Sequence, residues 1–216
     1  YTEAVRRIRE LVQRQALGDV FAADLVFHNG YGPDKAWFYD PALSGGGCVM
    51  DLGVHLVDLA LWMLDFPDVV DVSSHLYARG RPLQAGEVED YAVVTLGLAS
   101  GATVRVACSW RLELGCDAVI SAKFYGTSGG AALRNVGGSF YDFEAAHFTG
   151  TSREILAKPP DPWGGRAAAE WAMKLAAGGG FAVSTSGLLE TARVLDRVYG
   201  RGAAISGSGT QLQATR

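Results

Sequence analysis

Between residues 69 and 125 the sequence is a series of segments in which apolar and polar residues alternate. A period of two is typical of a β-strand that buries one face, because successive side chains point to opposite sides of the strand. Ser100-Gly101 and Ser128-Gly129-Gly130 separate segments and have the residue types of tight turns. Strands joined by such short turns pair in antiparallel fashion. The predicted strands cover 69–78, 91–98, 103–110 and 118–125, with weaker strands near Ala131 and Phe140.

Helical patterns lie on both sides of this block. Val5, Ile8, Leu11 and Leu17 recur near the helical period, and Gly18 is suited to end that helix. The other predicted elements are a strand over 21–28 and helices over 167–175 and 188–199. We therefore expect an α+β fold, with an open, mostly antiparallel sheet and helices packed on one face.

Composition limits the classes of protein to consider. The chain has 216 residues, of which 49% are hydrophobic and 19% charged, which is ordinary for a globular domain. We expect one domain over 1–200 and a flexible tail over 201–216, where glycine and serine dominate. A net charge of -4 without a basic cluster predicts no nucleic-acid partner. We also predict no membrane partner. Three cysteines without a C-x-x-C pair favour reduced thiols and a cytoplasmic protein.

The most specific motif is GGGCVMDLGVHLVDLALWML, which begins at Gly45. It places Asp51 and His55 four residues apart, so a regular helix would present both on one face, with Asp58 and Trp62 farther along. An imidazole beside a carboxylate near a helix start can accept a proton near neutral pH, which makes His55 the candidate base. Alternatively, Asp51 complements the helix dipole and His55 is a partly buried packing residue. Asp58 has the position of a capping residue, and we expect Trp62 in the core.

The residues before this helix are the candidate substrate contacts. Gly46 and Gly47 would let the backbone approach a ligand closely. Aromatic side chains can form the floor of a sugar-binding pocket, although three aromatics before a turn are as often ordinary packing. The candidates in this group are Trp37, Tyr39, Asp40 and, at the end of the strand over 21–28, His28.

Metal binding is the other chemistry that the motif allows. Asp51, His55 and Asp58 are suitable ligand types for zinc or manganese. Ligands on one helix need a further ligand from elsewhere, and neither an H-E-x-x-H motif nor a second histidine pair supplies it. We therefore predict no metal site.

Taken together, these motifs resemble the C-terminal domain of the Gfo/Idh/MocA family of NAD(P)-dependent oxidoreductases. The likeness rests on the Asp51-x-Gly53-x-His55 motif, on residues 1–20 as a linking helix, and on a strand that ends in Gly126-Thr127. It implies that His55 takes the hydroxyl proton of a sugar, polyol or inositol-like substrate while a nicotinamide takes the hydride. Asp51 would orient the imidazole or bind a substrate hydroxyl. The resemblance also implies a homo-oligomer formed through the open face of the sheet.

The family's nucleotide-binding half is not recognisable in this sequence. Neither the G-x-G-x-x-G fingerprint of a Rossmann domain nor the family's Glu-Lys-Pro segment occurs. We therefore expect NAD or NADP in a full-length protein that includes a Rossmann domain. The 216-residue chain alone is predicted to bind no cofactor and to be inactive. The alternative is a stand-alone, non-catalytic binding or assembly module with the same fold.

Overall fold

The computed structural model describes residues 2–179 and 186–201, so the predicted flexible tail lies almost wholly outside the described residues. The strands form one nine-stranded sheet in the order β3-β2-β4-β5-β1-β6-β7-β8-β9. Neighbouring strands are antiparallel except for the central pair, β1 and β5, which run parallel. The strands are β1 (Val20–Asn29), β2 (Val69–Ala78), β3 (Arg81–Pro82), β4 (Tyr91–Leu98), β5 (Thr103–Ser109), β6 (Ala118–Gly126), β7 (Gly130–Asn135), β8 (Phe143–Thr149) and β9 (Ser152–Ala157).

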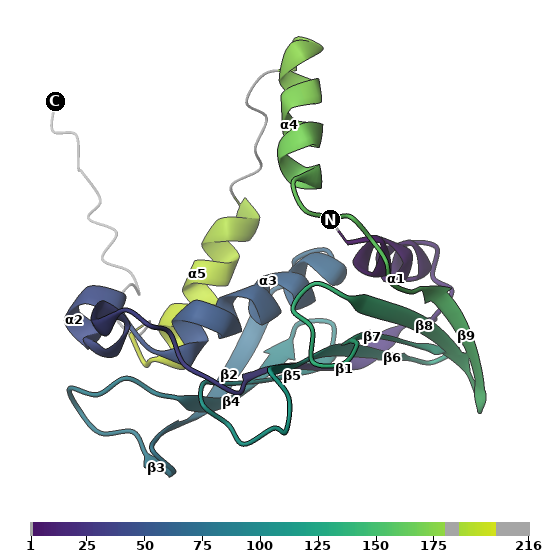
Figure 1. Ribbon diagram of the computed structural model, residues 1–216. Coiled ribbons are helices and arrows are strands. Elements are labelled where there is room, and N and C mark those ends of the chain that lie inside the picture. The colour runs from purple at the N-terminus through teal and green to yellow at the C-terminus, as the bar shows by residue number, and fades with distance from the viewer. Residues whose placement is uncertain (1, 180–185, 202–216) are drawn as a thin grey trace, which may run out of the picture.

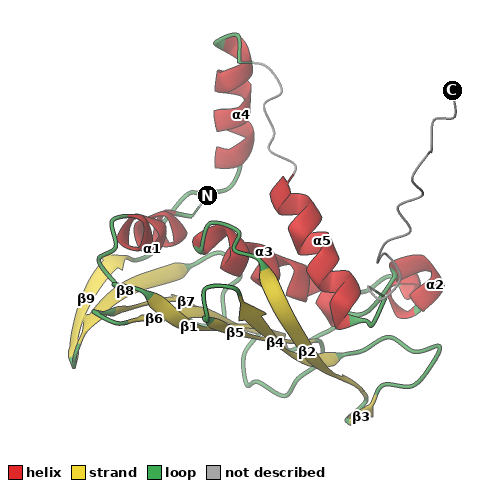
Figure 2. Cartoon of the chain, turned by 180° about the vertical axis from the view of Figure 1, so that it is seen from behind, coloured by secondary structure: helices red, strands yellow, loops and turns green. Residues whose placement is uncertain are grey.

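The helices lie on one side of this sheet, as Figures 1 and 2 show from opposite directions. None of the helices in the described residues covers the other face of the sheet. The predicted α+β architecture is thus confirmed. The helical elements are α1 (Glu3–Gln13), the 3-10 helix η1 (Ala36–Tyr39), α2 (Pro41–Ser44), the π-helical turn η2 (Val49–Gly53), α3 (Val54–Met63), α4 (Arg166–Ala176) and α5 (Ser186–Val198).

Strand β4 shows how the alternating sequence produces the core. Ala92, Val94 and Leu96 are buried, whereas Tyr91 and Val93 on the other face are only partly buried. The buried side chains pack beneath the helices, and removal of their apolar surface from water stabilises the fold. The period of two in the sequence therefore identifies the face that the helices cover.

Helix α3 is the central helix of the core. Its apolar stripe is buried, with Leu56, Ala60 and Met63 all less than 5% exposed. The stretch Pro41–Met63 has the length and hydropathy of a membrane-crossing helix, but 61% of its most apolar window is buried inside the protein. The prediction of Trp62 in the core is wrong, because its side chain is 37% exposed and lies beneath the Arg9 guanidinium.

Elsewhere the structure differs from the sequence prediction in local detail. Helix α1 ends at Gln13 rather than at Gly18, because residues 14–18 form turns that bring Leu17 into the core. The strand expected near Phe140 begins at Phe143, and strand β9 was not predicted. Much of β9 is exposed at the sheet edge, so its sequence lacks the regular alternation of a strand with one buried face.

Candidate active site at the start of helix α3

A cleft of about 690 Å³ lies between helices α1 and α3 and the helix-covered face of the sheet. His55, in the first turn of α3, is exposed and lines this cleft together with Asp58 and Trp62. This arrangement places an imidazole where a substrate can reach it. Further lining side chains are aromatic, namely Phe27, Phe140, Phe143 and Trp163.

Polar groups in the cleft come from three helices. Asp58 of α3 accepts a hydrogen bond from the Thr191 hydroxyl, which lies within α5, at 3.3 Å, so the observed partner is a helix side chain rather than a capped loop. Arg6 of α1 and Glu170 of α4 also line the cleft and approach each other to 3.8 Å. The cleft therefore combines apolar ring surfaces with groups that can donate and accept hydrogen bonds.

Asp51 does not share the face of His55 as a regular α-helix would require. It lies in η2, and a π-helical turn changes the angular spacing of the side chains before α3 begins. The Asp51 carboxylate accepts a hydrogen bond from the indole N–H of Trp110 at 2.9 Å, and no hydrogen bond joins it to His55 in the described part of the chain. Asp51 is also not among the residues that line the His55 cleft. The expectation that spacing alone sets the two side chains on one surface is corrected accordingly.

Trp37 and Tyr39 gather around the same tryptophan. The Tyr39 ring meets Trp110 edge-on at 5.7 Å, and Trp37 stacks on Phe38, whose ring in turn meets Trp110. Arg111 lies over the Tyr39 ring and donates a hydrogen bond to its hydroxyl. Trp37, Phe38 and Tyr39 thus form an aromatic cluster around Trp110, the residue that donates a hydrogen bond to Asp51. None of these three side chains lines the His55 cleft.

Asp40 caps a helix. Its side chain accepts a hydrogen bond from the Ala42 N–H at 2.9 Å at the start of α2, which is the usual role of aspartate before a helix. The structure therefore accounts for Asp40 through local backbone bonding.

The close approach that Gly46 and Gly47 permit is to the protein itself. A Cβ atom added to Gly47 would lie 1.9 Å from the Glu89 carbonyl oxygen, and one added to Gly46 would lie 2.2 Å from the Tyr199 hydroxyl. These contacts explain why neither position carries a side chain. What the two glycines accommodate is a buried glutamate and a tyrosine rather than a ligand.

His28 lies on the uncovered face of the sheet. Its neighbours on β1, Leu25 and Phe27, contribute to the core, so strand alternation turns His28 away from His55. The His28 ring stacks on Tyr91 at 5.8 Å and its Nδ1 hydrogen-bonds with the Ser109 hydroxyl at 2.8 Å. Partial burial lowers the pKa of His28. The structure does not bring this residue to the cleft.

Glu89 is the residue at this site that sequence reasoning missed. It is completely buried and accepts hydrogen bonds from the backbone N–H groups of Gly47 and Val49 and from the Tyr199 hydroxyl. Burial, with the nearby Glu89 charge, raises the pKa of Tyr199 far above its usual value, so the hydroxyl stays a donor. No local sequence pattern identifies Glu89 as a buried residue. Glutamate is rarely buried completely, so its position just before an alternating strand gave no reason to expect it in the core.

The structure offers no metal centre in residues 2–179 and 186–201, where no three histidine, cysteine or carboxylate side chains form a group that could hold an ion. Cys48 and Cys108 are buried with their sulfur atoms 3.8 Å apart. Burial raises the pKa of the Cys48 thiol. These cysteines are therefore packing groups beside the helix start.

Comparison with known proteins agrees with this architecture. The D-glucoside 3-dehydrogenase of Escherichia coli K12 is 26% identical over 140 residues, which are 59% of this chain and 40% of that protein. GenD2 from gentamicin A biosynthesis, solved with NAD, is 26% identical with a TM-score of 0.71; the match covers 94% of this chain and 59% of GenD2. The chain thus spans well under two thirds of the length of either relative.

A further solved structure shares the fold at lower identity. It is the aldose-aldose oxidoreductase of Caulobacter crescentus, solved with glycerol, which has a TM-score of 0.75 at 22% identity; the match covers 93% of this chain and 58% of that protein. Residues 5–132 match the model of the GFO/IDH/MocA C-terminal domain. Because that match covers more than half of the sequence and carries the His55 motif, the chain belongs to the GFO/IDH/MocA family and comprises its C-terminal domain.

Proposed function

We propose that this chain is the substrate domain of an NAD(P)-dependent oxidoreductase that acts on a hydroxyl or carbonyl group of a sugar or polyol. The observation that carries the proposal is the exposed His55 imidazole at an aromatic-lined cleft of about 690 Å³. A reachable imidazole is the side chain best suited to exchange a proton near neutral pH. The similarity to a D-glucoside 3-dehydrogenase, and to GenD2 solved with NAD, supports the same reaction class.

The lining of the cleft supports a carbohydrate-like substrate. Trp62, Trp163 and Phe140 offer ring faces that pack against the C–H surface of a sugar ring. Asp58 and Glu170 can accept hydrogen bonds from hydroxyl groups, and Arg6 can donate them. A cleft with mostly apolar walls and a few polar groups orients such a molecule.

In the proposed reaction, His55 accepts the proton of the substrate hydroxyl as that carbon is oxidised, and returns it in the reverse direction. A bound nicotinamide would supply the hydride acceptor for this reaction. The exposed side of His55 leaves room for such a group beside the substrate, but the chain has no glycine fingerprint for the dinucleotide phosphates. Those phosphates are therefore assigned to another domain of the full-length protein.

The test is the substitution His55→Ala in the full-length protein, assayed with both cofactors against a panel of sugars and polyols. Loss of the proton acceptor should lower kcat by about 10²–10⁴-fold, with a smaller change in KM. His75→Ala is the matched control, because His75 is an exposed histidine on β2 and does not line the cleft. Turnover by His55→Ala equal to that of His75→Ala would remove His55 from the mechanism.

We also propose that the isolated chain lacks cofactor binding. Titration of the 216-residue protein with NADH should give no saturable change in nicotinamide fluorescence, whereas the full-length protein should give one. Saturation with the isolated chain would contradict this part of the proposal.

A further inference from the structure

Glu89 joins three segments that are distant in the sequence. Its carboxylate accepts hydrogen bonds from Gly47 N–H at 3.0 Å and Val49 N–H at 2.9 Å, just ahead of α3, and from Tyr199 beyond the end of α5 at 2.7 Å. Its own carbonyl oxygen accepts a fourth hydrogen bond from Cys48 N–H at 3.0 Å. The helix start is thus held from two sides by one residue.

A carboxylate is the group that suits this position. Every partner of the Glu89 side chain is a donor, and a carboxylate is an acceptor without donor hydrogens. Burial of a charge without such partners would be strongly unfavourable. The first N–H groups of a helix have no partners within the helix, so Glu89 supplies acceptors that the preceding glycines cannot.

Gly46 and Gly47 also pack too closely against Tyr199 and Glu89 to leave room for a side chain. Any side chain at Gly47 would overlap the Glu89 backbone, and the Tyr199 hydroxyl fills the space beside Gly46. Both glycines are buried. The helix start therefore has little freedom to slide or rotate while Glu89 stays in place.

We propose that Glu89 is a positioning residue that fixes the π-helical turn η2 and the start of α3, and thereby the location of His55. Gly47 and His55 are separated by about two turns of helix, so a change of axis at the glycines moves the imidazole. Because Glu89 is completely buried, it acts through the backbone and does not touch the substrate. This inference rests on the proposed function of His55.

The test compares Glu89→Gln with Glu87→Gln in the full-length protein. Glu89→Gln keeps the shape of the side chain but directs an amide N–H₂ group toward donors. We expect kcat to fall by about 100-fold with KM little changed, because a small displacement of a reacting group is costly to catalysis. Glu87→Gln is the same change on a partly buried, ion-paired glutamate of the same loop, and it should retain the wild-type kcat.

Hydrogen exchange supplies a readout that does not depend on activity. In Glu89→Gln the amides of residues 47–55 should lose protection, while those of strands β6 and β7 keep it. The proposal would be overturned if Glu89→Gln lowered stability alone. In that case its folded fraction would keep the wild-type kcat, and the amides of residues 47–55 would keep their wild-type protection from exchange.

Two further experiments test the proposal if Glu89→Gln does not fold or if the full-length protein is inactive. If Glu89→Gln does not fold, Tyr199→Phe removes one donor and leaves the backbone contacts; a lower kcat with faster exchange at 47–55 supports the proposal, and wild-type values overturn it. If the wild-type full-length protein oxidises no sugar or polyol, the proposed function fails. The exchange rates of the same variants then still decide whether Glu89 fixes the helix start.

Discussion

The indole N–H of Trp110 donates a hydrogen bond to the Asp51 carboxylate at 2.9 Å, and this contact connects the end of β5 to the turn that precedes helix α3. Trp110→Phe should lower the free energy of unfolding by about 1–3 kcal/mol, because it removes the donor and leaves a partly buried carboxylate without it. Urea denaturation measures this difference. Trp37→Phe is the control, since Trp37 is 47% exposed, and equal stability of the two variants would contradict the prediction.

Gly47 should tolerate no side chain. Gly47→Ala places a Cβ atom 1.9 Å from a backbone oxygen that cannot rotate away, so we expect a loss of about 3 kcal/mol of stability or failure to fold. In Gly164→Ala, by contrast, the added Cβ meets nothing within 4 Å and the backbone angle is ordinary, so its thermal midpoint should match the wild type. Calorimetry of both variants checks the pair, and a stable Gly47→Ala protein would show that the glycine contact is wrong.

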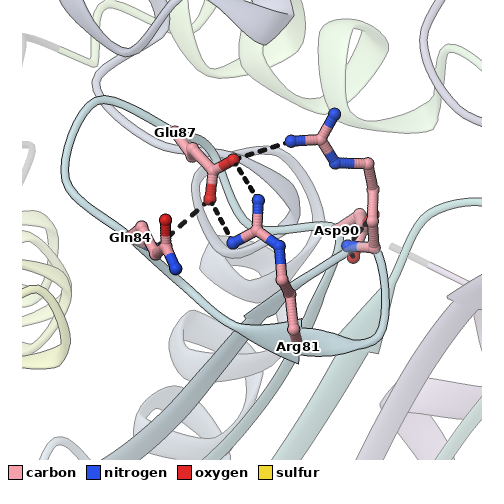
Figure 3. Close-up of polar contacts among 5 residues, drawn as sticks. Arg81, Gln84, Glu87 and Asp90 are labelled. Atoms are coloured by element: carbon pink, nitrogen blue, oxygen red, sulfur yellow. Dashed lines mark hydrogen bonds and ion pairs between the residues drawn. The ribbon is translucent and has the colours of Figure 1, made fainter.

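Glu87 should titrate at unusually low pH. Paired hydrogen bonds from the Arg81 guanidinium, with a further contact from Arg79, lower the pKa of Glu87 from 4.5 to about 2 (Figure 3). Because the folded-state pKa is lowered, the stability that this group contributes is present above pH 4.5 and is lost as the pH falls toward 2. Carbon-13 NMR titration of the Glu87 carboxyl measures the midpoint, which should move upward in Arg81→Gln. A wild-type midpoint near 4.5 would exclude the ion pair in solution.

His28 should titrate below its ordinary range. Partial burial beneath Tyr91 disfavours the imidazolium form and lowers its pKa from 6.5. The lowered folded-state pKa gives a contribution to stability that is present above pH 6.5 and declines as the pH falls through the folded-state pKa. Proton NMR of the folded protein should show His28 titrating below pH 6.5. A midpoint at or above pH 6.5 would contradict the burial of His28.

The sequence predicted the sheet well because alternation is a local signal of a strand with one buried face. Strand β4 matches its predicted range at both ends, and its buried residues are those that the alternation selects. The prediction was weakest at β9. This strand lies at the sheet edge with most of its residues exposed, so its sequence does not alternate between apolar and polar residues. For the site, the motif around His55 led directly to a residue that lines a cleft.

The remaining site predictions depended on geometry that spacing does not contain. A regular helix would align Asp51 with His55, but the π-helical turn between Val49 and Gly53 directs Asp51 to Trp110. Similarly, strand β1 carries apolar residues on both faces, so only the position of the helices shows that His28 lies on the uncovered one.

The sequence by itself determined the alternating strands, the apolar stripe of α3 and the motif that contains His55, because each is written in residues close together along the chain. Only the tertiary structure decided which groups hold that motif in place. Glu89 meets Gly47 and Val49 across a sequence separation of 40 residues or more, and Tyr199 reaches the same carboxylate across 110. Such contacts form when distant segments pack together and hydrogen-bond one another's buried polar groups. The periodicity of a local segment does not indicate which distant residue will be its partner.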